Sequence, residues 1–259
     1  MFNLANLFTA ANMISGIAAI LFAFMGRIDL APFAIVLGAI FDFFDGFIAR
    51  KLKKDGDLGK QLDSLADMIT FGLAPGMVML VLMTADIEGY LLDRHYEVIR
   101  YDFFAYLEGI VQGTETYAVP FFALSVPFFA LFRLAKFNID ARQTTQFFGL
   151  PTPANTLFLM TFPLVLCYSE IEYNETIELL FNPALLSFVT VAMSLLMVVG
   201  VPLFSLKFKS FGWKSNEVRF VFLLISSVFI LIFKAWSIAL IVILYLILSL
   251  IVNKRKNEI

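Results

Sequence analysis

The sequence predicts an all-α membrane protein, a polytopic transmembrane helical bundle with about eight spans. Of the 259 residues, 60% are hydrophobic and only 15% are charged, and the mean hydropathy is +0.86. These values lie far outside the averages of soluble domains. Several apolar runs also reach the ~20 residues that a helix needs to cross a bilayer. A water-soluble globular protein is therefore excluded.

Apolar runs of helical length locate the spans in order along the chain. We expect them at residues 4–26, 29–50, 60–84, 118–137, 154–169, 182–205, 218–233 and 236–252. The first run has no basic segment before it, so we expect it to remain in the mature protein rather than act as a signal peptide. The last two runs form one stretch that is too long for a single straight span, and its interruption at Lys234–Ser237 predicts a turn.

The connections give two further expectations. Residues 86–117 are acidic and rich in aromatic side chains, which favours a helical piece lying at the membrane interface. Gly149, Leu150 and Pro151 predict a turn that starts the fifth span. Since no internal repeat or linker is evident, residues 1–259 are expected to form one domain, with a core over about 1–205 and two extra helices in 206–259.

The distribution of basic residues predicts the orientation. Most of the 19 Lys and Arg residues lie in segments 50–60, 133–142 and 207–219 or in the tail at 254–256. In an eight-span arrangement these segments share one side. By the positive-inside rule, both termini and these segments face the cytoplasm, and the protein is integral to the cell membrane.

Charge and rare residues exclude several classes of function. A net charge of −2 gives no basic footprint for nucleic acid. The only cysteine, Cys167, cannot form an intrachain disulfide, and the only histidine, His95, cannot build a His-rich metal site. Because that histidine lies in a charged loop, the chain also provides no Ser-His-Asp triad. Any chemistry must be built from carboxylates, Arg and Lys.

Four aspartates occupy helix ends that are otherwise apolar. Helical spacing puts Asp42, Asp45, Gly46 and Ala49 on one stripe of the second span, and Gly59, Asp63 and Asp67 on one stripe of the third. Fully buried, four aspartates would cost on the order of 10 kcal/mol. Two hard divalent cations, Mg²⁺ or Mn²⁺, would offset that cost and suit oxygen ligands. The alternative is that ordinary helix-end acids pair with Arg50, Lys51 and Lys60.

Together these residues form the pattern D-x-x-D-G-x-x-A-R-x₈-G-x-x-x-D-x-x-x-D, which runs from Asp42 to Asp67. It resembles the signature of the CDP-alcohol phosphotransferases. The resemblance implies transfer of a phosphoryl-linked group from a CDP-activated donor to an alcohol, with release of CMP. It also implies a cytoplasm-facing active-site cavity that contains two divalent metals.

Other segments resemble the integral-membrane members of this family whose acceptor is serine. They are Asn6 to Gly16, Phe71 to Pro75, Arg133 to Asn138 and Phe148 to Ala154. Two positions depart from the pattern, because Ala5 replaces a proline and Lys136 replaces an arginine. This resemblance implies CDP-diacylglycerol and L-serine as substrates, and a homodimer, which is common in the family.

The resemblance also assigns roles to residues. Asp42, Asp45, Asp63 and Asp67 would be metal ligands, with Asp67 also the base that deprotonates serine. Gly46, Ala49, Arg50, Gly59, Asn6 and Thr9 would lie on the nucleotide side. The basic residues Arg133, Lys136 and Arg142 could bind the serine carboxylate, although cations at a cytoplasmic helix end are also expected from topology alone.

Three alternatives remain open at the level of the sequence. The acceptor could be glycerol phosphate, an inositol phosphate or choline. A covalent intermediate on an aspartate could replace direct in-line attack. Intramembrane acids also line cation transporters, but such proteins more often have broken helices near the midplane and paired repeats.

Overall fold

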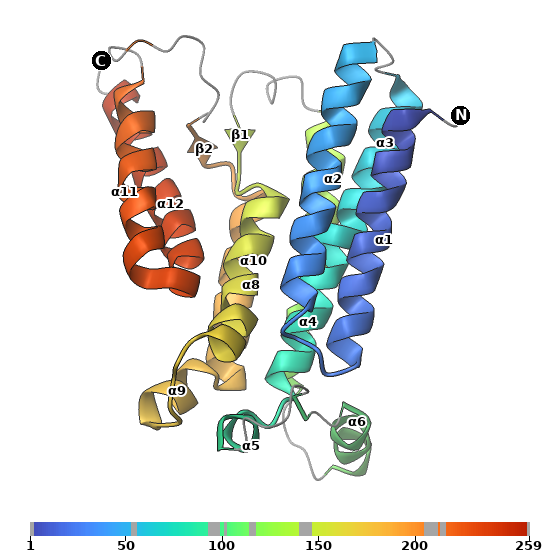
Figure 1. The fold of residues 1–259 in the computed structure, drawn as a ribbon, viewed down its shortest axis with the longest axis vertical. Coiled ribbons are helices and arrows are strands. Elements are labelled where there is room, and N and C mark those ends of the chain that lie inside the picture. The colour runs from blue at the N-terminus through green and yellow to red at the C-terminus, as the bar shows by residue number, and fades with distance from the viewer. Residues whose placement is uncertain are drawn as a thin grey trace.

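Long apolar helices run side by side along the longest axis of the molecule in the computed structural model (Figure 1). The structure describes residues 3–52, 56–92, 99–100, 103–113, 118–139, 147–204, 212 and 216–257. In chain order the elements are α1 (Leu4–Phe24), α2 (Ala31–Leu52), α3 (Asp57–Asp67), η1 (Met68–Leu73), α4 (Ala74–Met83), α5 (Ile87–Leu92), α6 (Phe103–Gln112), η2 (Val119–Leu124), α7 (Ser125–Ile139), β1 (Phe147–Phe148), α8 (Thr152–Tyr168), α9 (Glu175–Leu180), α10 (Pro183–Val198), β2 (Pro202–Leu203), α11 (Glu217–Phe233), η5 (Lys234–Trp236) and α12 (Ser237–Asn257).

The helices confirm an all-α membrane protein. By length and composition, five stretches of the described chain could cross a membrane: Leu4–Phe24, Ala31–Leu52, Asp57–Met83, Val119–Ile139 and Glu217–Val252. Two further apolar helices, α8 and α10, are shorter. Each of the eight expected ranges is therefore mainly helical, while eight membrane crossings remain a prediction.

The last apolar stretch turns back on itself where the sequence predicts a turn. The 3₁₀ segment η5 separates α11 from α12, and Lys234 adopts a positive φ of 46° there. The two helices pack against each other (Figure 1). Tyr245 of α12 fixes this hairpin to the strand region by donating a hydrogen bond to the Phe204 carbonyl (3.0 Å).

Two details differ from the expected spans. The third span is not a continuous α-helix, because η1 is a π-helical segment inside it. The expected 182–205 span ends at Val198, since β2 leaves the bundle and pairs antiparallel with β1. Gly149, with φ of 78°, makes the predicted turn before α8, and a Cβ there would collide with the Met197 carbonyl.

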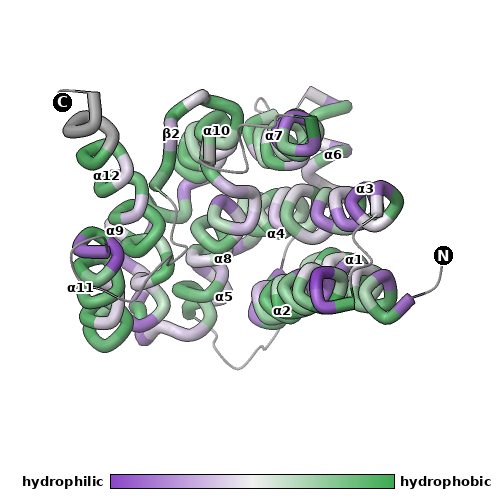
Figure 2. Tube along the Cα trace, turned by 90° about the horizontal axis from the view of Figure 1, so that it is seen from above, coloured by the Kyte–Doolittle hydropathy of each residue, from purple (hydrophilic) through white to green (hydrophobic). Residues whose placement is uncertain are grey.

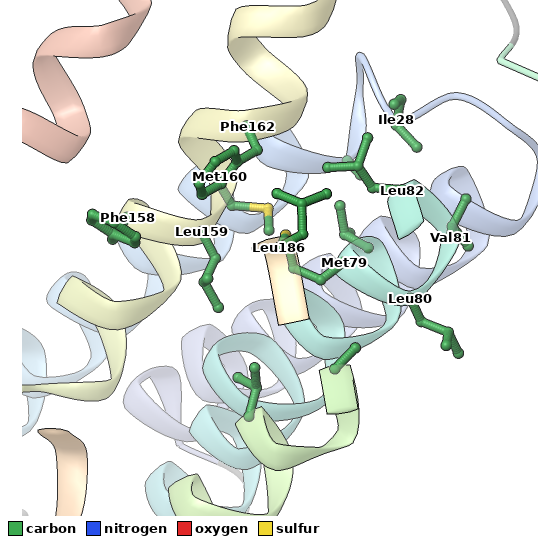
Figure 3. Packing of buried hydrophobic residues seen from close by; sticks show 14 of the residues in the cluster. Ile28, Met79, Leu80, Val81, Leu82, Phe158, Leu159, Met160, Phe162 and Leu186 are labelled. Carbon is green, nitrogen blue, oxygen red and sulfur yellow. The ribbon is translucent and has the colours of Figure 1, made fainter. Parts of the chain in front are cut away.

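The core surrounds α4, which lies between the other long helices (Figure 2). Every residue of α4 except the partly buried Met77 is buried. Figure 3 shows Met79 and Leu82 of α4 meeting Met160 of α8 and Leu186 of α10. At the periphery, by contrast, Leu224 and Leu231 of α11 are 68% and 82% exposed. Apolar side chains on the outer surface suit a bundle that is surrounded by lipid.

The two ends of the bundle differ in content. Helices α5, α6 and α9 lie at one end of the bundle (Figure 1). Two of them, α5 and α6, are the short helices that the 86–117 segment contains among its described residues. Helix α1 begins, α2 ends, α3 begins and α12 ends at the opposite end (Figure 1). The aspartate motif lies toward that second end.

Candidate active site

Three of the four motif aspartates form a compact acidic cluster, called here the aspartate triad: Asp42 of α2 with Asp63 and Asp67 of α3. One carboxylate oxygen from each residue lies within 4.8 Å of the other two. Their helices explain the geometry, because α1 packs against both α2 and α3 and the i, i+4 spacing puts Asp63 and Asp67 on one face of α3. All three side chains are partly shielded from solvent.

Asp45 does not join the aspartate triad in the described structure. Its Oδ2 accepts a short hydrogen bond (2.6 Å) from the hydroxyl of Thr9, which lies on α1. Both residues are buried, at 5% and 6% exposure. The structure therefore places three of the four expected metal ligands together and holds the fourth against α1.

An open cavity of about 880 Å³ lies beside these residues, between α1, α2 and the start of α3. Asp42, Asp45 and Asp63 line it, whereas Asp67 is not among its lining residues. The residues expected on the nucleotide side all line this cavity: Asn6, Thr9, Gly46, Ala49, Arg50 and Gly59. The two stripes predicted from helical spacing thus face one space.

The two glycines of the motif keep this cavity open. A Cβ on Gly59 would meet only Asn6 Oδ1, at 3.9 Å, so the space over that backbone is free. A Cβ on Gly46 would lie 3.3 Å from Arg50 Nη1, which shows that the guanidinium lies over Gly46. A larger side chain at either position would occupy the cavity.

The sequence suggested Lys60 only as one of the basic residues that indicate orientation or that could pair with helix-end acids. In the structure its side chain has a defined position. Lys60 lines the cavity, and its Nζ donates to the backbone carbonyl of Asn138 at the end of α7 (2.9 Å). Asn138 Nδ2 in turn donates to Ser64 Oγ on α3 (2.8 Å). Lys60 lies three residues before Asp63, on the side of α3 that faces the cavity. That spacing is the signal that could have identified it.

Asn12 belongs to the Asn6 to Gly16 segment that resembles the family, but no role was predicted for it from the sequence. Its Nδ2 donates a hydrogen bond to Asp67 Oδ1 (3.1 Å), and its side chain is fully buried. It lies three residues after Thr9 on α1, so both side chains face the motif aspartates. That spacing was the available signal.

Of the basic residues expected at the acceptor site, the structure describes Arg133 and Lys136, and neither of these two lines the cavity. Arg133 is 8% exposed, and its Nε donates to the Leu150 carbonyl (2.7 Å). Its guanidinium carbon also lies 5.7 Å from the ring centre of Phe137. Its helix, α7, packs against α3, which carries Asp63 and Asp67.

The remaining two expected acceptor residues are less constrained. Lys136 is exposed at the end of α7. Arg142 lies outside the described residues. Of the two described residues, Arg133 rather than Lys136 is buried within the bundle.

The arrangement has a clear chemical capacity. The aspartate triad offers only oxygen ligands, which hard divalent cations prefer. Arg50 and Lys60 add two cations along the adjoining cavity. A metal-binding cluster beside a cavity with cationic side chains suits a ligand that carries phosphate groups.

Comparisons with known proteins agree with this chemistry. A family model described as CDP-alcohol phosphatidyltransferase matches residues 2–203. The chain is 30% identical over 194 residues to a CDP-diacylglycerol–serine O-phosphatidyltransferase of Bacillus subtilis, covering 73% of this chain and 83% of that protein. A protein of the same name from Helicobacter pylori strain 26695 is 30% identical over 268 aligned positions, covering 97% of this chain and 95% of the relative.

An archaeal relative has a related name. The archaetidylserine synthase of Methanothermobacter thermautotrophicus is 26% identical over 200 residues, which cover 76% of this chain and 68% of that protein.

Proposed function

The chain belongs to the CDP-alcohol phosphatidyltransferase family, and we propose that it transfers the phosphatidyl group of CDP-diacylglycerol to the hydroxyl of L-serine. The products are phosphatidylserine and CMP. The single observation on which this proposal rests is the aspartate triad beside a cavity lined by the other residues of the motif. The relatives that carry serine in their names support serine as the acceptor.

The residues present fit a divalent metal centre. Asp42, Asp63 and Asp67 offer oxygen ligands within 4.8 Å of one another, and Asp45 lies on the same cavity. We assign two divalent cations, Mg²⁺ or Mn²⁺, to these four carboxylates. When bound, such cations neutralise the diphosphate of the donor and stabilise the charge that develops on the departing CMP.

The cavity residues bind the cytidine diphosphate part of the donor in this proposal. Gly46, Ala49 and Gly59 have little or no side chain, so the nucleotide can lie against the helix backbones. Arg50 supplies a guanidinium suited to a phosphate group. Lys60 adds a second cation on the facing helix, and Asn6 completes the nucleotide side from α1.

The transfer itself is an in-line displacement. The serine hydroxyl oxygen forms a bond to the phosphorus that bears diacylglycerol, and the bond from that phosphorus to the CMP oxygen breaks. The hydroxyl proton goes to Asp67, the member of the triad that accepts a hydrogen bond from Asn12. Direct attack needs no covalent intermediate on the protein, so the other carboxylates are free to hold the cations.

Arg133 is the residue we assign to the serine carboxylate. Arg133 lies on α7, which packs against α3, the helix that carries Asp63 and Asp67, so an acceptor bound at Arg133 lies on the side of the proposed base. Lys136 and Arg142 belong to the same basic segment and supply additional positive charge near the acceptor side.

The protein acts within the lipid bilayer, where its donor substrate resides. We propose that both termini and the cavity face the cytoplasm, because Arg50 and Lys51 at the end of α2 and Lys60 in α3 lie at the end of the bundle that holds the motif. We further propose a core of about residues 1–205, which the extent of the family match supports, two added helices in 206–259, and a homodimer.

One assay tests the proposed reaction. Purified protein in detergent is incubated with CDP-diacylglycerol, Mn²⁺ and one of several alcohols: L-serine, glycerol 3-phosphate, an inositol phosphate or choline. We expect CMP release and a phospholipid product with L-serine alone. Release with another alcohol in preference to serine would reassign the acceptor, and the absence of release with all of them would refute the proposed activity.

A further inference from the structure

Helix α1 contacts two of the motif aspartates through side chains that lie one helical turn apart. Thr9 donates to Asp45 Oδ2, and Asn12 Nδ2 donates to Asp67 Oδ1. The spacing of three residues puts both donors on one face of α1. Asn12 lies outside the motif that runs from Asp42 to Asp67, and the resemblance of the Asn6 to Gly16 segment to the family assigned it no role.

The environment of Asn12 leaves its amide a single hydrogen bond. The residue is 0% exposed, and its Oδ1 has no hydrogen-bond partner among the described residues. Gly38 of α2 lies against that oxygen, since a Cβ on Gly38 would come within 3.0 Å of it. Burying an unpaired amide oxygen costs stability, whereas an apolar side chain of the same size would not incur that cost. What the amide supplies is the N–H donor at Asp67.

The orientation of the amide is fixed by its partner. If the nitrogen and oxygen of Asn12 were exchanged, the carbonyl oxygen would face the oxygen of Asp67. An ionised carboxylate repels such an oxygen but accepts the N–H. The hydrogen bond therefore restrains rotation of the Asp67 carboxylate about its bond to Cβ.

The backbone of Asn12 is also tied to the chain that follows Asp67. Thr70, in the π-helical segment η1, donates from Oγ1 to the Asn12 carbonyl (2.9 Å). Gly16 permits this contact, because a Cβ there would lie only 2.6 Å from Thr70 Oγ1. The side chain and the carbonyl of Asn12 thus hold α1 to Asp67 and to the segment that follows it.

From these contacts we propose that Asn12 is a positioning residue that holds the Asp67 carboxylate in the orientation in which it joins the aspartate triad. The inference rests on the proposed function, in which Asp67 contacts a metal ion and accepts the serine proton. Asn12 touches neither the substrate nor the metal and acts only through Asp67.

Kinetics of two variants provide the first test. Asn12→Leu keeps a similar volume and removes the donor, and Asn12→Ser shortens the side chain in case the leucine variant fails to fold. Loss of a partner that orients a metal ligand typically costs about 10- to 100-fold in activity or metal affinity. We expect kcat to fall by that factor, with the KM values for serine and CDP-diacylglycerol within about threefold of the wild type, since the substrate contacts lie elsewhere.

Ser15→Ala is the matched control, because Ser15 is a buried polar residue of the same helix. Among the described residues, its hydroxyl bonds only within α1, to the Ala11 carbonyl (2.9 Å). This variant should keep the wild-type kcat. A folded Asn12→Leu protein with kcat within about twofold of the wild type would overturn the inference.

Mn²⁺ binding, followed by electron paramagnetic resonance, gives a readout that needs no turnover. Asn12→Leu should weaken Mn²⁺ binding by about 10-fold in the wild-type background and change it little in the Asp67→Asn background, because a residue that acts through Asp67 has nothing left to orient. An equal loss in both backgrounds would refute action through Asp67. If the wild type released no CMP with serine, the proposed function would fail while this binding cycle would still decide the role of Asn12.

Discussion

At the scale of single residues, the aspartates have separate environments despite their common motif. Asp45 accepts the Thr9 hydroxyl, Asp67 accepts the Asn12 amide, and Asp42 and Asp63 line the open cavity. The sequence could identify all four because acids in an apolar helix end stand out. It could not identify their hydrogen-bond donors, because Thr9 and Asn12 lie on a helix more than thirty residues away in the chain.

The separate place of Asp67 leads to a kinetic prediction. Asp67→Asn should lower kcat by roughly 10²- to 10⁴-fold if Asp67 is the general base. It should affect binding of CDP-diacylglycerol less than Asp42→Asn or Asp63→Asn does, because those two residues line the cavity. Turnover with serine and equilibrium binding of the donor separate the two effects. Near-normal turnover in Asp67→Asn would require another base.

Arg133 provides a prediction for the acceptor. Arg133→Ala should raise the KM for serine by about 10- to 150-fold, as expected for loss of a charge-assisted contact. The KM for CDP-diacylglycerol should change much less. Because Arg133 also donates to the Leu150 carbonyl, the melting temperature of the variant in detergent serves as the control for folding. An unchanged KM for serine in a folded variant would remove Arg133 from the acceptor site.

At the scale of elements, local sequence predicted the helices better than their interruptions. Apolar runs placed α1, α2 and the continuous stretch of η2 and α7 to within a few residues of their observed ends. The π-helical segment η1 was missed, because it depends on contacts from other helices: Thr156 of α8 donates to the Phe71 carbonyl (2.8 Å). The early end of α10 was missed because β2 pairs with a strand that is distant in the chain.

Close packing of α1 and α2 on η1 gives a stability prediction. A Cβ on Gly38 would lie 2.6 Å from Thr70 Cγ2, so Gly38→Leu must push α2 away from η1. We expect a loss of about 1–3 kcal/mol or more from overpacking, measured as a lower melting temperature in detergent. Gly200→Ala is the control, because no atom lies within 4 Å of a Cβ there. Equal melting temperatures for the two variants would contradict the packing described.

At the scale of the whole molecule, composition and motif together predicted the class of protein. Hydropathy identified a helical membrane protein, and the family match over residues 2–203 confirmed the resemblance that the motif indicated. The three-dimensional relation between the acidic cluster and Arg133 was beyond the sequence, because it requires the placement of α7 against α3 and α8. The number of membrane crossings and the side on which the termini lie stay predictions.

The central claim is that this membrane bundle performs metal-assisted phosphatidyl transfer at the aspartate triad. The most direct test measures CMP release from CDP-diacylglycerol and L-serine by the purified protein after treatment with EDTA. We predict that EDTA abolishes release and that Mn²⁺ or Mg²⁺ restores it, because the triad and the donor diphosphate both need a cation to balance their charge. Full turnover in metal-free buffer would contradict the claim.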